Sequence, residues 1–135
     1  MARLYRQAPL NSIWEGSGNV ICLDVLRAMG REPEAMAALR EELVAASGAD
    51  PRYDAFLAEL EVELRDVATL ESRARRLVER LALALQASIL LREDGGAIAE
   101  AFVASRLVER HGTYGTLPTG APVELLIERA HPLRS

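Results

Sequence analysis

A carboxylate set between an aromatic ring and a glycine-rich turn is the most chemically suggestive feature of the sequence. Glu15 follows Trp14 and precedes Gly16, Ser17 and Gly18. An apolar neighbour raises the pKa of a carboxylate and can make it a general base. The first N–H groups of the helix that follows have no intrahelical acceptor and could bind a phosphate. The same residues also suit an ordinary capped helix with an exposed glutamate, so chemistry alone leaves both interpretations open.

No second cluster of catalytic type accompanies this segment. The single cysteine, Cys22, excludes an internal disulfide and a thiolate metal cluster, and it suits a small buried apolar residue. His111 and His131 each follow a predicted helix and have no further ligand at metal-binding spacing, so we expect no metal site. The glycine-rich stretch 115–120 lacks the lysine of a phosphate-binding loop, and the whole chain contains no lysine.

The elements that must hold this segment are predicted to be helices. Half of the 135 residues are hydrophobic but only 4% are aromatic, so aliphatic side chains must fill the core. Alanine and leucine dominate among them, and both are strong helix formers. A chain of this length suits one domain. We therefore expect an all-α fold, an antiparallel bundle of about five to six helices with short connections.

Caps and breakers predict the helix boundaries. Residues 1–16 are predicted to be irregular. Ser17 caps a first helix, apolar on nearly all sides, that ends at Met29 with Gly30 as its left-handed stop. Further helices are predicted over 33–46, 51–65, 66–91, 97–110 and 122–130. The start of the fourth helix stays open, because either Asp66 or Thr69 could begin it, or the chain could continue with a bend.

The charge and hydropathy of the chain limit its partners. The formal net charge is −4, which argues against a general affinity for nucleic acid or anionic lipid. The most apolar run, residues 81–91, is too short to span a bilayer. No basic segment followed by an apolar stretch opens the chain, so we expect no secretory signal and a cytoplasmic location.

The order of residues around Glu15 carries a family resemblance. Residues 11–19 read Asn-Ser-Ile-Trp-Glu-Gly-Ser-Gly-Asn. They closely resemble the C-terminal signature of the flavin-dependent acyl-CoA dehydrogenases, in which an aromatic-Glu-Gly-Thr/Ser stretch precedes the last helix of the C-terminal helical domain. This longer form looks like the alkylation-response branch of that family. Residues 101–107 and 115–118 look like the C-terminal end of bacterial members of the branch, so the resemblance covers essentially the whole chain.

The resemblance implies a role for each matching position. Glu15 aligns with the catalytic base, which takes the α-proton of the acyl thioester while hydride leaves the β-carbon for the flavin. Trp14 aligns with the aromatic residue that walls the acyl pocket and would bind the substrate. Ser17 aligns with a threonine that hydrogen-bonds the diphosphate region of FAD, and Asn19 with a glutamine that contacts its ADP portion. Gly16 would allow the backbone to approach the cofactor closely.

The resemblance also divides the chain. Residues 1–30 would be the catalytic-motif segment and last helix of an acyl-CoA dehydrogenase-like C-terminal domain, and residues 31–135 an additional C-terminal helical region. The parts that hold the flavin ring and the CoA in this family are absent. We therefore expect the chain by itself to be inactive and free of FAD, and whether it is an enzyme alone stays open. The apolar first helix predicts that residues 13–29 pack on another copy, fold back on the other helices or become disordered.

Two alternatives belong to other functional classes. One is a helical oligomerisation module, in which Glu15 merely lies beside a helix cap. The other is a DNA-binding accessory domain, because the resembling branch is reported to bind duplex DNA through its C-terminal domain. The DNA-binding alternative depends on four arginines of the fourth predicted helix, Arg73, Arg75, Arg76 and Arg80. Glu71 and Glu79 are interleaved with them, and Arg75 and Glu79 can pair, so a solvated, salt-bridged face is the favoured interpretation.

Overall fold

The structure, a computed structural model, describes residues 2–12, 18–93, 95–109 and 117–131. Within these ranges every regular element is a helix, which confirms the all-α prediction. None of the described helices combines the length and the apolarity needed to cross a bilayer. The elements in chain order are α1 (Ala2–Gln7), η1 (Ala8–Ser12), α2 (Gly18–Arg31), α3 (Pro33–Val44), α4 (Pro51–Arg65), η2 (Val67–Thr69), η3 (Glu71–Arg73), α5 (Ala74–Glu93), α6 (Ala97–Phe102), η4 (Val103–Val108) and α7 (Val123–Ala130).

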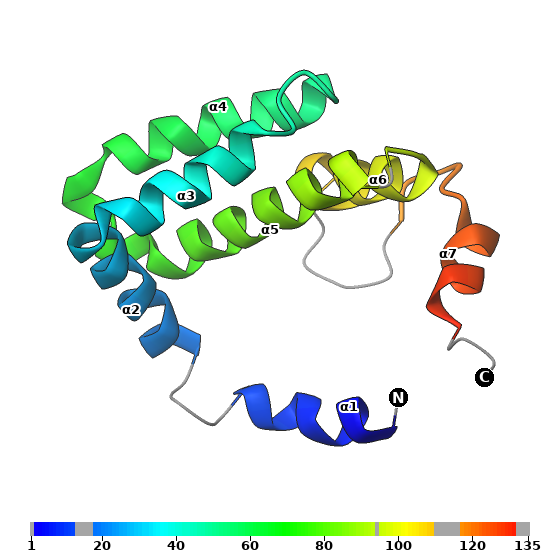
Figure 1. Cartoon of the computed structure of the whole chain (residues 1–135), viewed down its shortest axis with the longest axis horizontal. Helices are drawn as coiled ribbons and strands as arrows, with labels where there is room; N and C mark the ends of the chain where they lie inside the picture. The colour runs from blue at the N-terminus through cyan, green and yellow to red at the C-terminus, as the bar shows by residue number, and fades with distance from the viewer. Residues whose placement is uncertain (1, 13–17, 94, 110–116, 132–135) are drawn as a thin grey trace.

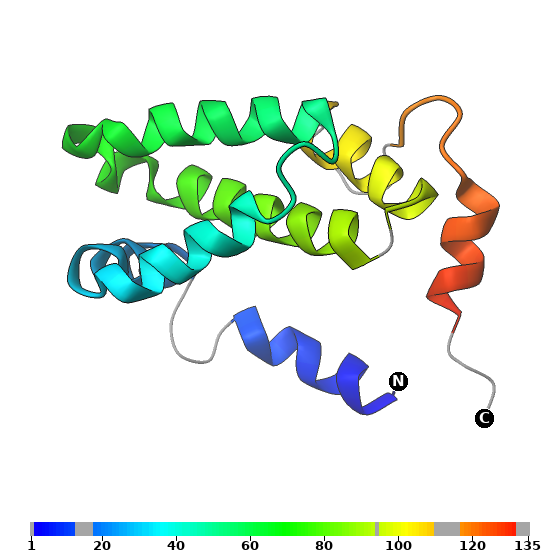
Figure 2. The same ribbon diagram turned by 45° about the horizontal axis from the view of Figure 1, so that its top comes forward.

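Helix α5 is the centre of the packing. Helices α3 and α4 each pack on α5, and the three helices run in alternating directions (Figure 1). Helix α2 packs on α5 and α3, and α6 with η4 packs on α4 and α5 (Figure 2). Short connections between successive helices favour antiparallel neighbours. The main core residues are Leu43, Tyr53, Phe56, Leu60, Leu77, Leu81, Ala84, Val103 and Leu107.

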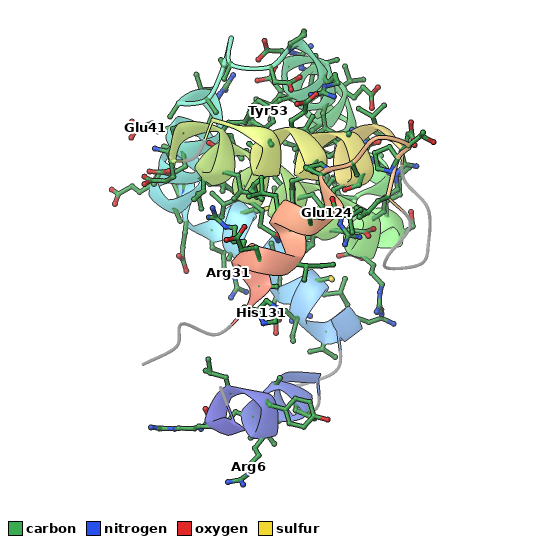
Figure 3. All side chains as sticks on the ribbon, turned by 90° about the vertical axis from the view of Figure 1, so that its right-hand side faces the viewer. Arg6, Arg31, Glu41, Tyr53, Glu124 and His131 are labelled. Carbon is green, nitrogen blue, oxygen red and sulfur yellow. The ribbon has the colours of Figure 1, made fainter. Side chains whose placement is uncertain are left out.

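A buried tyrosine ties α4 to α3. Tyr53 is 0% exposed, and its hydroxyl donates a hydrogen bond of 2.7 Å to the carbonyl oxygen of Leu43. This burial raises the pKa of the Tyr53 hydroxyl. Figure 3 shows Tyr53 among the packed helices, whereas Arg6, on α1, lies well away from them. The polar group of the tyrosine is therefore satisfied inside an otherwise aliphatic core.

The start of α4 follows the predicted capping pattern. Asp50 has an extended backbone and accepts a hydrogen bond of 2.8 Å from the N–H of Arg52, while Pro51 occupies the first helical position. The guanidinium of Arg52 also contacts the Asp50 carboxylate, and these hydrogen bonds lower the pKa of Asp50. Gly48, between α3 and α4, has a φ of 84°, a left-handed conformation that favours glycine. This predicted helix boundary is confirmed.

The predicted end of the first helix was wrong. Helix α2 continues through Gly30 to Arg31, and the N–H of Glu32 donates a hydrogen bond of 2.8 Å to the carbonyl oxygen of Ala28. Pro33 ends the helix instead, because a residue that precedes proline is disfavoured in the helical conformation. The backbone of Glu32 has accordingly left that conformation. The predicted start at Ser17 lies outside the described residues.

The expectation that residues 1–16 are irregular is corrected for the described part. Residues 2–7 form α1 and residues 8–12 form the 3-10 helix η1. Pro9 does not prevent this, because proline is tolerated in the first turn of a helix, where its missing N–H has no intrahelical acceptor. The side chains of residues 3–10 are all exposed, and α1 lies apart from the packed helices (Figure 1).

Two further boundaries differ from a simple helix pattern. Between α4 and α5 the 3-10 turns η2 and η3 intervene, so a new helix begins at Ala74 and the chain does not simply bend. After α6 the backbone widens into a π-helix, in which the N–H of Glu109 bonds the carbonyl oxygen of Ala104 five residues earlier. The hydroxyl of Ser105 also bonds the carbonyl oxygen of Ala101. The fifth predicted helix, over 97–110, is therefore two successive helical forms.

Candidate functional site

The first residue of the predicted site that the structure describes is Asn19. It lies in the first turn of α2, directly after Gly18. Trp14, Glu15, Gly16 and Ser17, the other predicted site residues, lie outside the described residues. The described part of the site therefore consists of the start of α2 and the side chains that contact it.

An arginine of α5 meets the start of α2. The Nη1 of Arg75 donates a hydrogen bond of 2.8 Å to the Oδ1 of Asn19, although 56 residues separate the two. A Cβ placed on Gly18 would lie 3.5 Å from the guanidinium of Arg75, in ordinary van der Waals contact. The guanidinium therefore covers the first turn of α2. The close packing of α2 on α5 brings them together.

Sequence reasoning missed this contact. The sequence pattern predicts a solvated face for Arg75, on which it can pair with Glu79 four residues later. Among the described residues Arg75 has no ion pair with a carboxylate, and its side chain bonds the Asn19 amide instead. Spacing along the sequence carries no signal for such a pair, because only the packing of α2 on α5 creates it.

Two neighbouring arginines, Arg73 of η3 and Arg76 of α5, are neutralised by acidic groups. Arg73 lies 3.4 Å from Asp66, and Arg76 lies 2.6 Å from Glu63. The prediction of a salt-bridged face is confirmed for these two arginines. Cations that already bind carboxylates on their own surface are poorly placed to release counterions from DNA.

Arg80 departs from the prediction of a solvated face. Its side chain is 2% exposed, and its guanidinium lies 4.3 Å from the centre of the Phe56 ring. It forms ion pairs of 3.0 Å with Glu59 and 3.6 Å with Glu63. A cation stacked on an aromatic ring and paired with two carboxylates is a structural clamp between α5 and α4. It is not available to a nucleic acid.

The remaining candidates add no second centre. Cys22 is buried, as predicted. His131 is exposed just after α7, and His111 lies outside the described residues. Over the described ranges no group of three or more His, Cys, Asp or Glu side chains could hold a metal ion.

An apolar groove of about 500 Å³ lies elsewhere on the molecule. It runs between α3 and α4 over Leu81 of α5, and its wall residues include Met36, Leu39, Leu57 and Leu64. Asn19, the predicted site residue that the structure describes, does not line it. The groove and the start of α2 are therefore separate features.

The start of α2 has properties that suit an anionic ligand. The first N–H groups of a helix have no intrahelical acceptor, and the helix dipole places partial positive charge there. The guanidinium of Arg75 adds a full positive charge beside this end. Of the described residues, Gly18, Asn19 and Arg75 fit the diphosphate and neighbouring groups of a flavin dinucleotide in charge and hydrogen-bonding type.

Comparison with known proteins gives one clear relative. The chain is 36% identical over 112 residues, 83% of its length, to AidB of Escherichia coli (strain K12), which carries the name of an acyl-CoA dehydrogenase. The chain spans 20% of the length of that relative. No family model matches the chain. The match is too long to be confined to residues 1–30, so it extends into the helical region that follows. The resemblance predicted from the residues around Glu15 is therefore confirmed, and the chain is a relative of the AidB-like acyl-CoA dehydrogenases, consistent with a C-terminal portion of such a protein.

Proposed function

We propose that this chain is the C-terminal portion of an FAD-dependent acyl-CoA dehydrogenase-like oxidoreductase. The complete protein converts an acyl-CoA to its 2-enoyl form. In this proposal residues 1–30 are the catalytic-motif segment and last helix of the C-terminal domain, and residues 31–135 are an additional helical region. The proposed setting is the cytoplasm. The similarity to AidB over 83% of the chain is the observation that carries the proposal.

Each site residue has a distinct task in the proposed reaction. The Glu15 carboxylate would remove the α-proton of the acyl thioester, and bound FAD would supply the two-electron acceptor that takes the β-hydrogen with its electron pair. Trp14 bounds the acyl pocket. Gly16 and Ser17 would hold the diphosphate of FAD, and Asn19 would contact its ADP portion. The position of Asn19 in the first turn of α2, beside Arg75, supports this division of tasks.

Binding and reduction of flavin by a chimera test the proposal. In this AidB chimera the present chain replaces the matching segment of the Escherichia coli protein. We expect the purified chimera to retain the absorption of FAD after desalting and to lose it when acyl-CoA is added without oxygen, because substrate oxidation reduces the flavin. A chimera that folds but binds no flavin would overturn the proposal.

A substitution of the proposed base separates chemistry from binding. We expect Glu15→Gln to slow flavin reduction about 10²–10⁴-fold, the usual contribution of a general base, while FAD stays bound. The matched control is Glu32→Gln, because Glu32 is an exposed glutamate at the other end of α2. Equal reduction rates in the two variants would remove Glu15 from the mechanism. The isolated 135-residue chain is expected to lose FAD on desalting.

A second candidate function is assembly of subunits. Helix α2 packs on α3 and α5 through one side, so the predicted fold-back is present over its described residues. Val20 and Ile21, next to the proposed site, are nevertheless 45% and 40% exposed. Apolar side chains left exposed beside one another favour association with a further protein surface. We therefore propose that the chain also contributes to a homo-oligomer of the complete protein.

A further inference from the structure

We propose that Arg75 is a positioning residue for the cofactor, because it fixes which end of the Asn19 side-chain amide is offered to the ligand. The inference rests on the proposed function, in which Asn19 contacts FAD. It concerns a residue of the additional helical region, far from the motif in sequence. The hydrogen bond from Arg75 to Asn19 joins the two regions at the first turn of α2.

The chemistry of the amide gives this hydrogen bond its consequence. An asparagine side chain has one carbonyl oxygen that accepts and one NH₂ group that donates. The guanidinium of Arg75 only donates, so it selects the Oδ1 of Asn19, at 2.8 Å. The Nδ2 group is then the end left for a ligand, and it can donate to phosphate, ribose or adenine acceptors. Without Arg75 the amide could turn over and offer either end.

The surroundings of Arg75 distinguish it from an ordinary surface cation. Arg73 and Arg76, on the same stretch of chain, are paired with Asp66 and Glu63. Within the described ranges Arg75 has no such carboxylate partner, and its guanidinium lies against Gly18 and Asn19 of α2. Among the described residues its guanidinium therefore has Asn19 as its hydrogen-bond partner and no competing carboxylate.

Flavin affinity of the AidB chimera tests the inference. The dissociation constant of FAD is measured by equilibrium dialysis for four forms: unmodified, Arg75→Ala, Asn19→Ala and the double variant. We expect each single substitution to weaken binding about tenfold, the effect of about one lost hydrogen bond. The double variant should bind no more weakly than either single one, because Arg75 acts through Asn19. Arg76→Ala is the matched control and should stay within about twofold of the unmodified chimera, because its removal breaks only an exposed ion pair.

A conservative variant separates positioning from mere support of the helix. Asn19→Asp keeps an acceptor for Arg75 and adds a carboxylate at a helix start, so the thermal unfolding midpoint should not fall. It removes the NH₂ donor, so FAD binding should weaken at least as much as in Asn19→Ala. Asn19→Asp binding FAD as tightly as the unmodified chimera would show that Arg75 only holds α2 in place.

The remaining outcomes are equally decisive. Equal affinities for Arg75→Ala and Arg76→Ala would overturn the inference and leave the proposed function intact, as would additive losses in the double variant. Failure of the unmodified chimera to bind FAD would overturn the proposed function, and the inference with it.

Discussion

The carboxylate of Asp50 shows what one side chain contributes to this fold. It is buried, accepts the first free N–H of α4 and pairs with the guanidinium of Arg52 at 2.6 Å. These contacts hold the pKa of Asp50 below its ordinary value of 3.8. A carboxyl whose pKa is lowered by folding stabilises the folded state above its unfolded pKa, and that stabilisation is lost as the pH falls through the lowered value.

We therefore expect Asp50→Asn to be destabilising at pH 7 and less destabilising near pH 2. Loss of the charge removes the ion pair with Arg52. The complete N-cap interaction of Asp50 contributes about 1 kcal/mol to the free energy of unfolding, so Asp50→Asn should cost less than this. Asn can still accept the hydrogen bond of the helix start, so Asp50→Ala should cost more than Asp50→Asn at pH 7. Urea unfolding of the three proteins at both pH values measures the effect. A difference between wild type and Asp50→Asn that does not shrink in acid would contradict the assignment.

Arg80 and Arg76 differ in burial, and their substitutions should differ accordingly. Removal of Arg80 leaves a void beside Phe56 and takes a cation from half-buried Glu63, so Arg80→Ala should cost about 3 kcal/mol. Arg76 binds the same glutamate from an exposed position, and Arg76→Ala should cost at most about 1 kcal/mol. Urea denaturation of both variants measures the loss in free energy of unfolding. Similar losses in the two variants would show that the burial of Arg80 does not increase its contribution to stability.

At the scale of elements, two glycines with equal space around them serve different purposes. A Cβ on Gly30 or on Gly48 would meet nothing within 4 Å. Gly48 has a positive φ, whereas Gly30 lies inside α2 and does not. Gly30→Ala should therefore stabilise the protein by about 0.5–1 kcal/mol, and Gly48→Ala should destabilise it by about 1 kcal/mol. Thermal and urea unfolding report the two signs. The same sign in both variants would contradict the assigned conformations.

These glycines also show how far the sequence predicts elements. The cap at Asp50 and the break at Gly95 are local signals. Helix α4 begins after the first and helix α5 ends before the second, as expected. Gly30 resembles a stop, yet Pro33 ends the helix, because a glycine permits a left-handed turn without requiring one. The π-helix at Val103–Val108 had no local signal, since its wider turns depend on how η4 packs on α4.

At the scale of the whole molecule, sequence order identified the motif but not its neighbours. The predicted role of Asn19 came from the residues around Glu15. The guanidinium beside it comes from a helix 56 residues later, and no periodicity or spacing could indicate Arg75. Contacts of this kind depend on which faces of two helices pack together. The packing of all the core side chains determines those faces.

The exposed apolar side of α2 leads to a prediction for the whole molecule. Val20 and Ile21 are consecutive, partly exposed residues of α2, while Val62, on α4, is 65% exposed. We expect the 135-residue chain to self-associate with rising concentration, because association removes the apolar surface of α2 from water. Ile21→Asp should shift sedimentation toward the monomer, whereas the matched Val62→Asp should not. A monomer at every concentration, or equal effects of the two substitutions, would mean that α2 alone does not drive assembly.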